Sequence, residues 1–200
     1  MTPDGADDFL GILMLATRFP RIPGDIGNPQ SHPFPVRYTV VDTATVDAVV
    51  TADGLSETVV TDFIAAAQAF EREGARAVTT SCGFLASAQD RLRDSLSIPV
   101  LASSLCFYPT VRRRHPEGPI GILTANGAAL GDPALTGAGV DPNSILVEGM
   151  ETCPAFADSI LADDPGPLDS AGIADGVTAA ASRLRERAPD LAAVLVECTN

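Results

Sequence analysis

Cys82 and Cys198 are the residues whose type and position point most directly to chemistry, because each ends a short apolar run. The run before Cys82 reads Ala-Val-Thr-Thr-Ser, and the run before Cys198 reads Ala-Val-Leu-Val-Glu. Gly83 allows a sharp turn into a helix after Cys82, and a thiol at a helix N-terminus has a lowered pKa because backbone N–H groups and the helix dipole favour the thiolate. Two thiols in one cleft, one of them ionised, can take a proton from a carbon and return one to its other face.

The elements that would position these cysteines form an alternating pattern. Apolar runs bounded by turn residues predict buried strands at 9–15, 36–41, 75–80, 98–102, 120–124, 145–148 and 192–196. Helical patterns cover residues 56–73, 85–96 and 168–188, and Ser56 is a suitable N-cap for the first. Strands that alternate with helices predict an α/β fold with mainly parallel sheets.

The order of these elements repeats along the chain. Gly11-Ile-Leu and Gly121-Ile-Leu begin the two halves, 110 residues apart, and the two cysteines are 116 residues apart. The repeat predicts two similar αβ lobes related by a pseudo-twofold axis, residues 1–110 with Cys82 and residues 111–200 with Cys198, with the active site in the cleft between them. A helix and a strand follow Cys82, so the second lobe is expected to lack their counterparts within these 200 residues.

Two other features of the sequence bear on the site. The segment 18–35 contains five prolines and two glycines, which predicts a long loop without helix or central strand, at the edge of the sheet where α/β proteins bind ligands. Cys106 and Cys153 have no counterpart in the repeat and are expected to be structural, since cysteine is often simply a small buried residue. The same structural role is the alternative for Cys82 and Cys198.

Composition limits the classes of partner. The chain has a formal net charge of -13, which disfavours nucleic acid and anionic lipid. Its acidic start and the short apolar run at 9–16 predict a soluble, cytoplasmic protein. No CxxC motif occurs and there are only two histidines, which argues against a zinc site or a disulfide framework. Dinucleotide-binding, GxSxG and Walker motifs are also missing from the sequence.

Four stretches together resemble the aspartate/glutamate/hydantoin racemase superfamily. They are Gly11-Ile12-Leu13, Pro23-Gly24-Asp25-Ile26-Gly27-Asn28, Thr80-Ser81-Cys82-Gly83 and Glu197-Cys198-Thr199-Asn200. The resemblance covers essentially the whole chain. It implies two αβ lobes, no pyridoxal phosphate or other cofactor, no metal, and a cysteine pair that acts as acid and base at a carbon next to a carboxylate.

The resemblance also implies roles for individual residues. Cys82 and Cys198 would be the catalytic pair. The substrate's carboxylate would be held by Thr80, Ser81, Gly83, Thr124, Asn126 and Thr199, with Asn28 and Arg21 of the long loop contributing. A homodimer is expected from the superfamily rather than from any pattern in this chain.

The presence of both cysteines favours a cofactor-independent racemase or epimerase of an amino acid or a related small carboxylate. A second hypothesis is an isomerase or decarboxylase of a small diacid, of the maleate or arylmalonate type, that uses one thiol. A third is a non-catalytic protein that binds a small molecule on the same scaffold.

Overall fold

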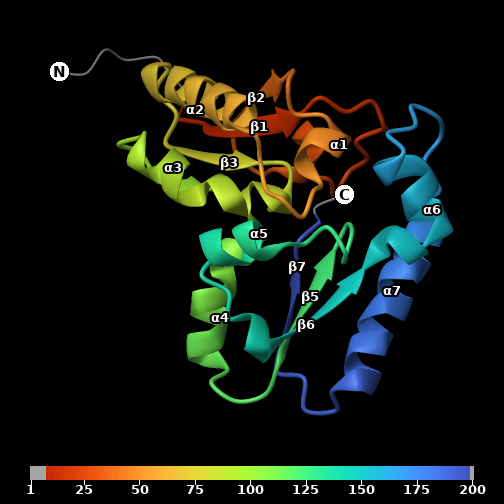
Figure 1. The fold of residues 1–200 in the computed structure, drawn as a ribbon. Coiled ribbons are helices and arrows are strands. Elements are labelled where there is room, and N and C mark those ends of the chain that lie inside the picture. Colours follow the sequence, from red (N-terminus) through yellow and green to blue (C-terminus); the bar gives the residue numbers. More distant parts are fainter. Residues whose placement is uncertain (1–7, 199–200) are drawn as a thin grey trace.

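The apolar runs form two parallel sheets in the structure, a computed structural model that describes residues 8–198 (Figure 1). The first sheet has the order β2-β1-β3-β4, with β1 (Leu10–Leu15), β2 (Val36–Val41), β3 (Ala77–Thr80) and β4 (Val100–Leu101). The second has the order β6-β5-β7, with β5 (Ile120–Thr124), β6 (Ile145–Gly149) and β7 (Ala193–Val196). Every strand pairing is parallel, so the predicted fold class is confirmed.

Helices connect these strands. The α-helices are α1 (Val46–Val49), α2 (Glu57–Arg72), α3 (Gln89–Asp94), α4 (Tyr108–Arg114), α5 (Asp132–Gly137), α6 (Pro154–Phe156) and α7 (Ser170–Arg187). The 3-10 helices are η1 (Pro29–Ser31), η2 (Gly83–Ala88), η3 (Ser104–Phe107), η4 (Pro142–Ser144) and η5 (Met150–Thr152), and η6 (Ala157–Leu161) is a π-helix. Among the described residues, no helix combines the length and the apolar character needed to cross a membrane.

The duplication predicted from the sequence is visible in the strand order. In each lobe the first strand lies in the middle, between the second strand and the strand that leads to a cysteine. The two glycines occupy matching places: a Cβ on Gly11 would meet the Phe70 ring of α2 at 2.5 Å, and one on Gly121 would meet Leu184 of α7 at 3.0 Å. Glycine at the start of each central strand therefore lets the long helix pack closely on its sheet.

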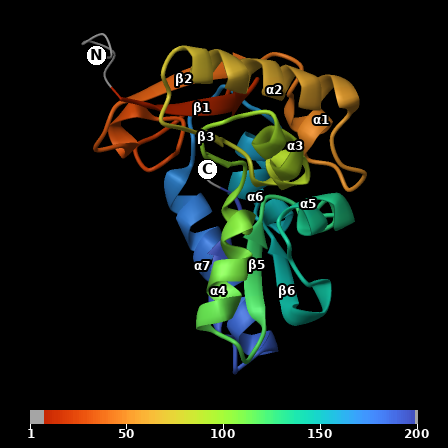
Figure 2. The ribbon, with the colours of Figure 1, turned by 90° about the vertical axis from the view of Figure 1, so that its left-hand side faces the viewer.

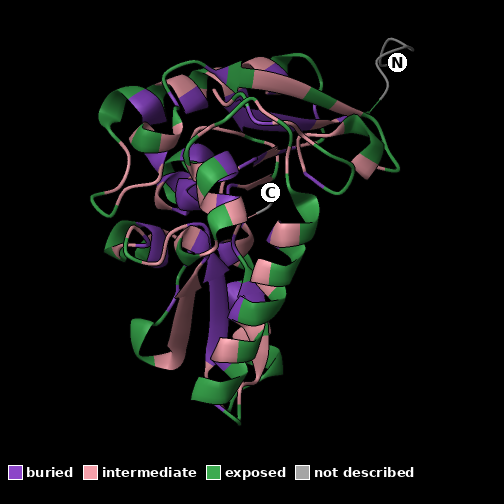
Figure 3. Cartoon of the chain, turned by 90° about the vertical axis from the view of Figure 1, so that its right-hand side faces the viewer, coloured by how far each residue is buried: buried purple, intermediate pink, exposed green. Residues whose placement is uncertain are grey.

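The two long helices pack their apolar faces against the sheets. Ser56 caps α2 by accepting a hydrogen bond from the Val59 N–H, as predicted. The buried side of α2 includes Phe63 and Phe70, and the helix lies across β1 and β2 (Figure 2). The exposed residues of α7 form its outer face (Figure 3). Leu184 is buried and lies over Gly121 of the second sheet.

Three predicted elements differ from the structure. Residues 85–96 form the 3-10 helix η2 followed by the short α3, instead of one helix. The segment 18–35 contains η1, because Pro29 starts a turn that the Asn28 side chain caps. The predicted strand 98–102 is reduced to the two residues of β4.

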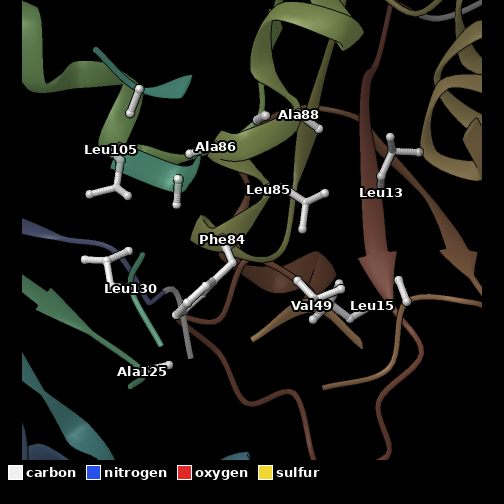
Figure 4. Packing of buried hydrophobic residues seen from close by; sticks show 14 of the residues in the cluster. Leu13, Leu15, Val49, Phe84, Leu85, Ala86, Ala88, Leu105, Ala125 and Leu130 are labelled. Carbon is white, nitrogen blue, oxygen red and sulfur yellow. The ribbon is translucent and has the colours of Figure 1, made fainter. Parts of the chain in front are cut away.

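Apolar side chains fill the junction between the lobes. Phe84 of η2 points from the first lobe toward Ala125 and Leu130 of the second (Figure 4). Gly137 of α5 lies so close to the Ala86 carbonyl that a side chain there would overlap it. The lobes therefore share one apolar cluster. The boundary between residues 110 and 111 stays a prediction, and these two residues lie inside α4.

Candidate active site

The ends of β3 and β7 present their cysteines through the same backbone arrangement. The Ser81 N–H donates to the Leu13 carbonyl over 2.9 Å, and the Glu197 N–H donates to the Leu123 carbonyl over 2.7 Å. Leu13 and Leu123 occupy the same place in β1 and β5, so Cys82 and Cys198 are structural equivalents one residue further on. The predicted pairing of the two cysteines therefore has a counterpart in the fold.

Both cysteines line one pocket between the lobes, and both are partly buried. The pocket holds about 390 Å³ of space between atoms, a figure that includes the solvent at its open mouth. Its polar side chains come from Thr17, Arg21, Ser81, Cys82, Glu197 and Cys198, and its remaining lining from Leu15, Phe19, Val46, Val50, Gly83, Ala125, Ile160 and Leu161. Within the described range, no three metal-ligating side chains gather at one point.

The expected lowering of the Cys82 pKa is wrong. Burial and the nearby Glu197 carboxylate raise the pKa of this thiol well above its usual value, and Cys198 raises it further. The hydrogen bond from the Phe84 N–H and the charge of Arg21 act in the opposite direction but are outweighed. The turn does supply a backbone hydrogen-bond donor, as predicted. Burial nevertheless destabilises the thiolate more than this hydrogen bond stabilises it.

Glu197 is a site residue that the sequence analysis missed. It is 1% exposed, and its Oε2 accepts hydrogen bonds from the Thr124 hydroxyl at 2.7 Å and the Ala125 N–H at 3.2 Å. Its Oε1 is buried without a hydrogen-bond partner among residues 8–198. Burial raises the pKa of this carboxyl to about 7, although both hydrogen bonds lower it. The site therefore holds an ionisable group beside its two thiols.

Gly83 gives the Glu197 carboxyl its space. A Cβ at Gly83 would overlap Oε1 and the adjacent carboxyl carbon, so the close approach requires glycine at the turn that follows Cys82. Of the residues expected to hold the substrate, Gly83, Ser81 and Arg21 line the pocket.

The threonines expected to hold the substrate are occupied elsewhere. The Thr80 hydroxyl donates to the Ala102 carbonyl at 2.6 Å, and Thr80 lines a neighbouring cavity that includes Cys82 and Ser103. The Thr124 hydroxyl donates to Glu197 and is fully buried. Both side chains act on the residues around the cysteines, and their role in binding substrate stays a prediction.

The two asparagines have structural partners as well. Asn126 accepts a hydrogen bond from the Ala129 N–H. Asn28 donates to the Arg21 carbonyl at 2.7 Å and so holds the loop segment that brings Arg21 to the pocket. Thr199, which was also expected to bind substrate, lies outside the described residues.

Arg21 brings a cation to the pocket wall. Its guanidinium forms an ion pair with Asp25 at 3.1 Å, donates to the Thr17 hydroxyl at 2.8 Å and lies over the Phe19 ring. These contacts hold the side chain in a partly buried position where a positive charge attracts a carboxylate.

Curated relatives of the chain are lyases. It is 29% identical over 197 residues to dimethylsulfoniopropionate lyase from Durusdinium sp. clade D, an alignment that covers 95% of the chain and 64% of the relative. It is 29% identical over 198 residues to dimethylsulfoniopropionate lyase 7 from Emiliania huxleyi (strain CCMP1516), covering 95% of the chain and 58% of that protein. The chain thus spans about three fifths of the length of these relatives. No family model matches the chain.

Solved structures with a similar fold include a decarboxylase, a racemase and a racemase homologue. Unliganded arylmalonate decarboxylase superposes with a TM-score of 0.54 at 14% identity, covering 95% of this chain and 80% of that one. Glutamate racemase from Bacillus anthracis gives 0.55 at 14% identity (98% and 70% covered), and an aspartate racemase homologue from Pyrococcus horikoshii OT3 gives 0.55 at 13% identity (96% and 85%). The chain has the fold of the aspartate/glutamate racemase superfamily.

The residue patterns that pointed to the two cysteines gave no reason to single out Glu197. The signal for it is nevertheless in the sequence, because an acidic residue directly follows the apolar run at 193–196. A buried carboxylate costs free energy unless it is paired, so an acidic residue at the end of a buried strand is a candidate functional residue. In the sequence patterns, Glu197 stood out only as the residue before Cys198.

Proposed function

We propose that the chain carries the active site of a cofactor-independent lyase that eliminates dimethyl sulfide from dimethylsulfoniopropionate. The observation that carries this proposal is that Cys82, Cys198 and Arg21 line one small pocket between the lobes. The similarity to dimethylsulfoniopropionate lyases supports the choice of substrate. The superfamily fold supports chemistry at a carbon next to a carboxylate.

The reaction needs one base. The Cys198 thiolate removes a proton from the carbon next to the substrate's carboxylate, so a C–H bond breaks and an S–H bond forms. The released electron pair forms a carbon–carbon double bond, and the bond from the next carbon to the sulfonium sulfur breaks. The products are acrylate, neutral dimethyl sulfide and a proton that leaves Cys198 for solvent. No oxidation or reduction is involved.

Cys82 acts as the acid of the pair. Its raised pKa keeps it a thiol at neutral pH, so it can donate a hydrogen bond to the substrate's carboxylate as negative charge builds there. Arg21 supplies a positive charge at the same pocket. The apolar lining from Leu15, Val46, Val50, Ile160 and Leu161 accommodates the methyl groups of the sulfonium and excludes water from the developing charge.

Racemisation is the second candidate, and the presence of both thiols in one pocket favours it. In a racemase, Cys198 would take the proton from one face and Cys82 would return its own to the other. Elimination has no such return step because the departing sulfur takes the electrons. The one-thiol decarboxylase or isomerase and the non-catalytic binding protein are further rivals that the same experiment separates.

To test the proposal, the folded chain is incubated with dimethylsulfoniopropionate in D₂O. Dimethyl sulfide is measured by headspace gas chromatography and acrylate by proton NMR. The same protein is given a panel of amino acids, hydantoins, maleate and arylmalonates. The proposal predicts equal amounts of dimethyl sulfide and acrylate. Deuterium incorporation into amino acids or hydantoins without elimination would contradict the proposal and indicate a racemase. Turnover of a diacid would indicate a decarboxylase or isomerase. No turnover of any compound would indicate a binding protein.

A further inference from the structure

At the ends of β3 and β7, two different side chains accept a hydrogen bond from equivalent backbone N–H groups. Ser81 accepts a hydrogen bond from the Leu15 N–H through its hydroxyl oxygen, at 3.1 Å. At the matching place, Glu197 accepts one from the Ala125 N–H through Oε2, at 3.2 Å. A hydroxyl is a sufficient acceptor for this backbone N–H in the first lobe. The equivalent N–H in the second lobe therefore does not require a carboxyl group. The second oxygen of Glu197 is surplus to this task.

That surplus oxygen lies beside Gly83, at the turn that follows Cys82. Oε1 of Glu197 approaches the Gly83 backbone so closely that no side chain fits there, and Gly83 directly follows the cysteine. Glu197 and Cys82 line the same pocket and also the cavity next to it. Because Oε1 has no donor among the described residues, nothing at that oxygen disperses its charge.

We propose that Glu197 is a positioning residue that holds Cys82 in its thiol form, and so assigns the acid role to Cys82. The inference rests on the proposed function for this role. The field of a buried carboxylate disfavours a second negative charge close to it, so the thiol proton stays on Cys82. Ser81, the equivalent residue in the first lobe, is uncharged and has no such effect.

The charges around the pocket agree with this assignment. Cys82 faces Glu197 and Cys198 from the end of β7 and Arg21 from the loop after β1, and its own turn offers the Phe84 N–H. Arg21 favours the thiolate, but it is already paired with Asp25. With a pKa of about 7, Glu197 gains its charge below the pH range in which a thiol ionises. The carboxylate is therefore in place when it is needed.

The test measures the reactivity of the Cys82 thiol, which does not depend on lyase activity. The folded chain is alkylated with iodoacetamide from neutral to alkaline pH, and the rate at Cys82 is read from its own peptide by mass spectrometry. In Glu197→Gln the midpoint of this profile should fall by about one pH unit. Glu151→Gln is the matched control and should leave the midpoint unchanged, because Glu151 accepts a hydrogen bond from the Gly127 N–H and lies outside the pocket.

An unchanged Cys82 midpoint in folded Glu197→Gln would overturn the proposal. If this variant fails to fold, Glu197→Ser takes its place, since it copies Ser81 and keeps an acceptor for the Ala125 N–H. If the wild type eliminates dimethyl sulfide, the alkaline limb of the pH profile of kcat should also move toward neutral pH in the variant. An unchanged alkaline limb would contradict a role for Glu197 in catalysis. If the wild type eliminates none, the proposed function fails and alkylation alone still decides whether Glu197 holds the Cys82 proton.

Discussion

Glu197 makes the stability of the protein depend on pH in the direction opposite to that of a salt-bridged carboxylate. Its pKa rises from 4.5 to about 7 on folding, so the folded state prefers the protonated form. The stabilisation is fully present below pH 4.5 and is lost as pH rises toward 7. Above that, the buried carboxylate reduces the free energy of unfolding.

Glu197→Gln removes this titration. Between about pH 5 and pH 8, wild type should lose on the order of 2 kcal/mol of unfolding free energy relative to the variant, because the group titrates differently in the folded and unfolded states. Urea unfolding of both proteins at the two pH values measures the difference. A constant gap between the two proteins would mean that Glu197 does not titrate in this range.

At the scale of residues, the sequence identified the cysteines but not their charge state. A thiol at a strand end next to glycine is recognisable from its neighbours in the chain. Glu197 comes from the other lobe, 115 residues away in the sequence, so its effect on Cys82 depends on how the lobes meet. The hydroxyl partners of Thr80 and Thr124 lie within their own lobes, but they are 22 and 73 residues away in the sequence, so local sequence does not reveal them either.

At the scale of elements, the turn from Cys82 into η2 depends on the size of Gly83. Gly83→Ala should lower the free energy of unfolding by roughly 1–3 kcal/mol, because the added methyl group overlaps the Glu197 carboxyl. The same change should reduce elimination, since it displaces the carboxyl from Cys82. Urea unfolding and dimethyl sulfide release measure the two effects.

Gly127→Ala is the matched control for this change. A Cβ at Gly127 has its nearest neighbour at 3.4 Å, an ordinary contact, so stability should change little. Equal stability of the two alanine variants would show that the turn can accommodate a side chain and would contradict the geometry described for Gly83.

Element boundaries were predictable where the pattern was strong. The runs at 36–41 and 120–124 match β2 and β5 residue for residue, because β-branched and apolar residues fill them and turns flank them. The helix predicted at 85–96 is split because its start packs closely against α5 around Ala86, where η2 winds as a 3-10 helix. The 3-10 geometry of η2 depends on packing between the lobes, which cannot be predicted from the local sequence.

At the scale of the whole molecule, an exposed ion pair joins the lobes next to the pocket. The Arg18 backbone N–H and guanidinium donate to the carboxylate and carbonyl of Asp163. Arg18 lies between Thr17 and Phe19, which line the pocket, and Asp163 follows η6, which contributes Ile160 and Leu161. The pair therefore holds two walls of the pocket together.

Asp163→Ala should raise the KM for dimethylsulfoniopropionate roughly threefold while kcat changes little, because an exposed ion pair contributes up to about 1 kcal/mol. Salt should raise the KM of the wild type in the same way. Steady-state kinetics measure both effects. Asp90→Ala, which breaks an exposed ion pair with Arg93 on α3, serves as the control. The same KM in Asp163→Ala and Asp90→Ala would remove the role of this contact.

Dimethyl sulfide release by Cys198→Ser, Cys82→Ser and Cys106→Ser variants tests most directly whether the facing cysteines carry out the elimination. Loss of the base should reduce kcat by about 10²–10⁴ in Cys198→Ser. Cys82→Ser should lose less, because serine can still donate a hydrogen bond. Cys106, whose thiol donates to Gln89 outside the pocket, should be replaceable at little cost. Full activity in folded Cys198→Ser would contradict the proposed mechanism.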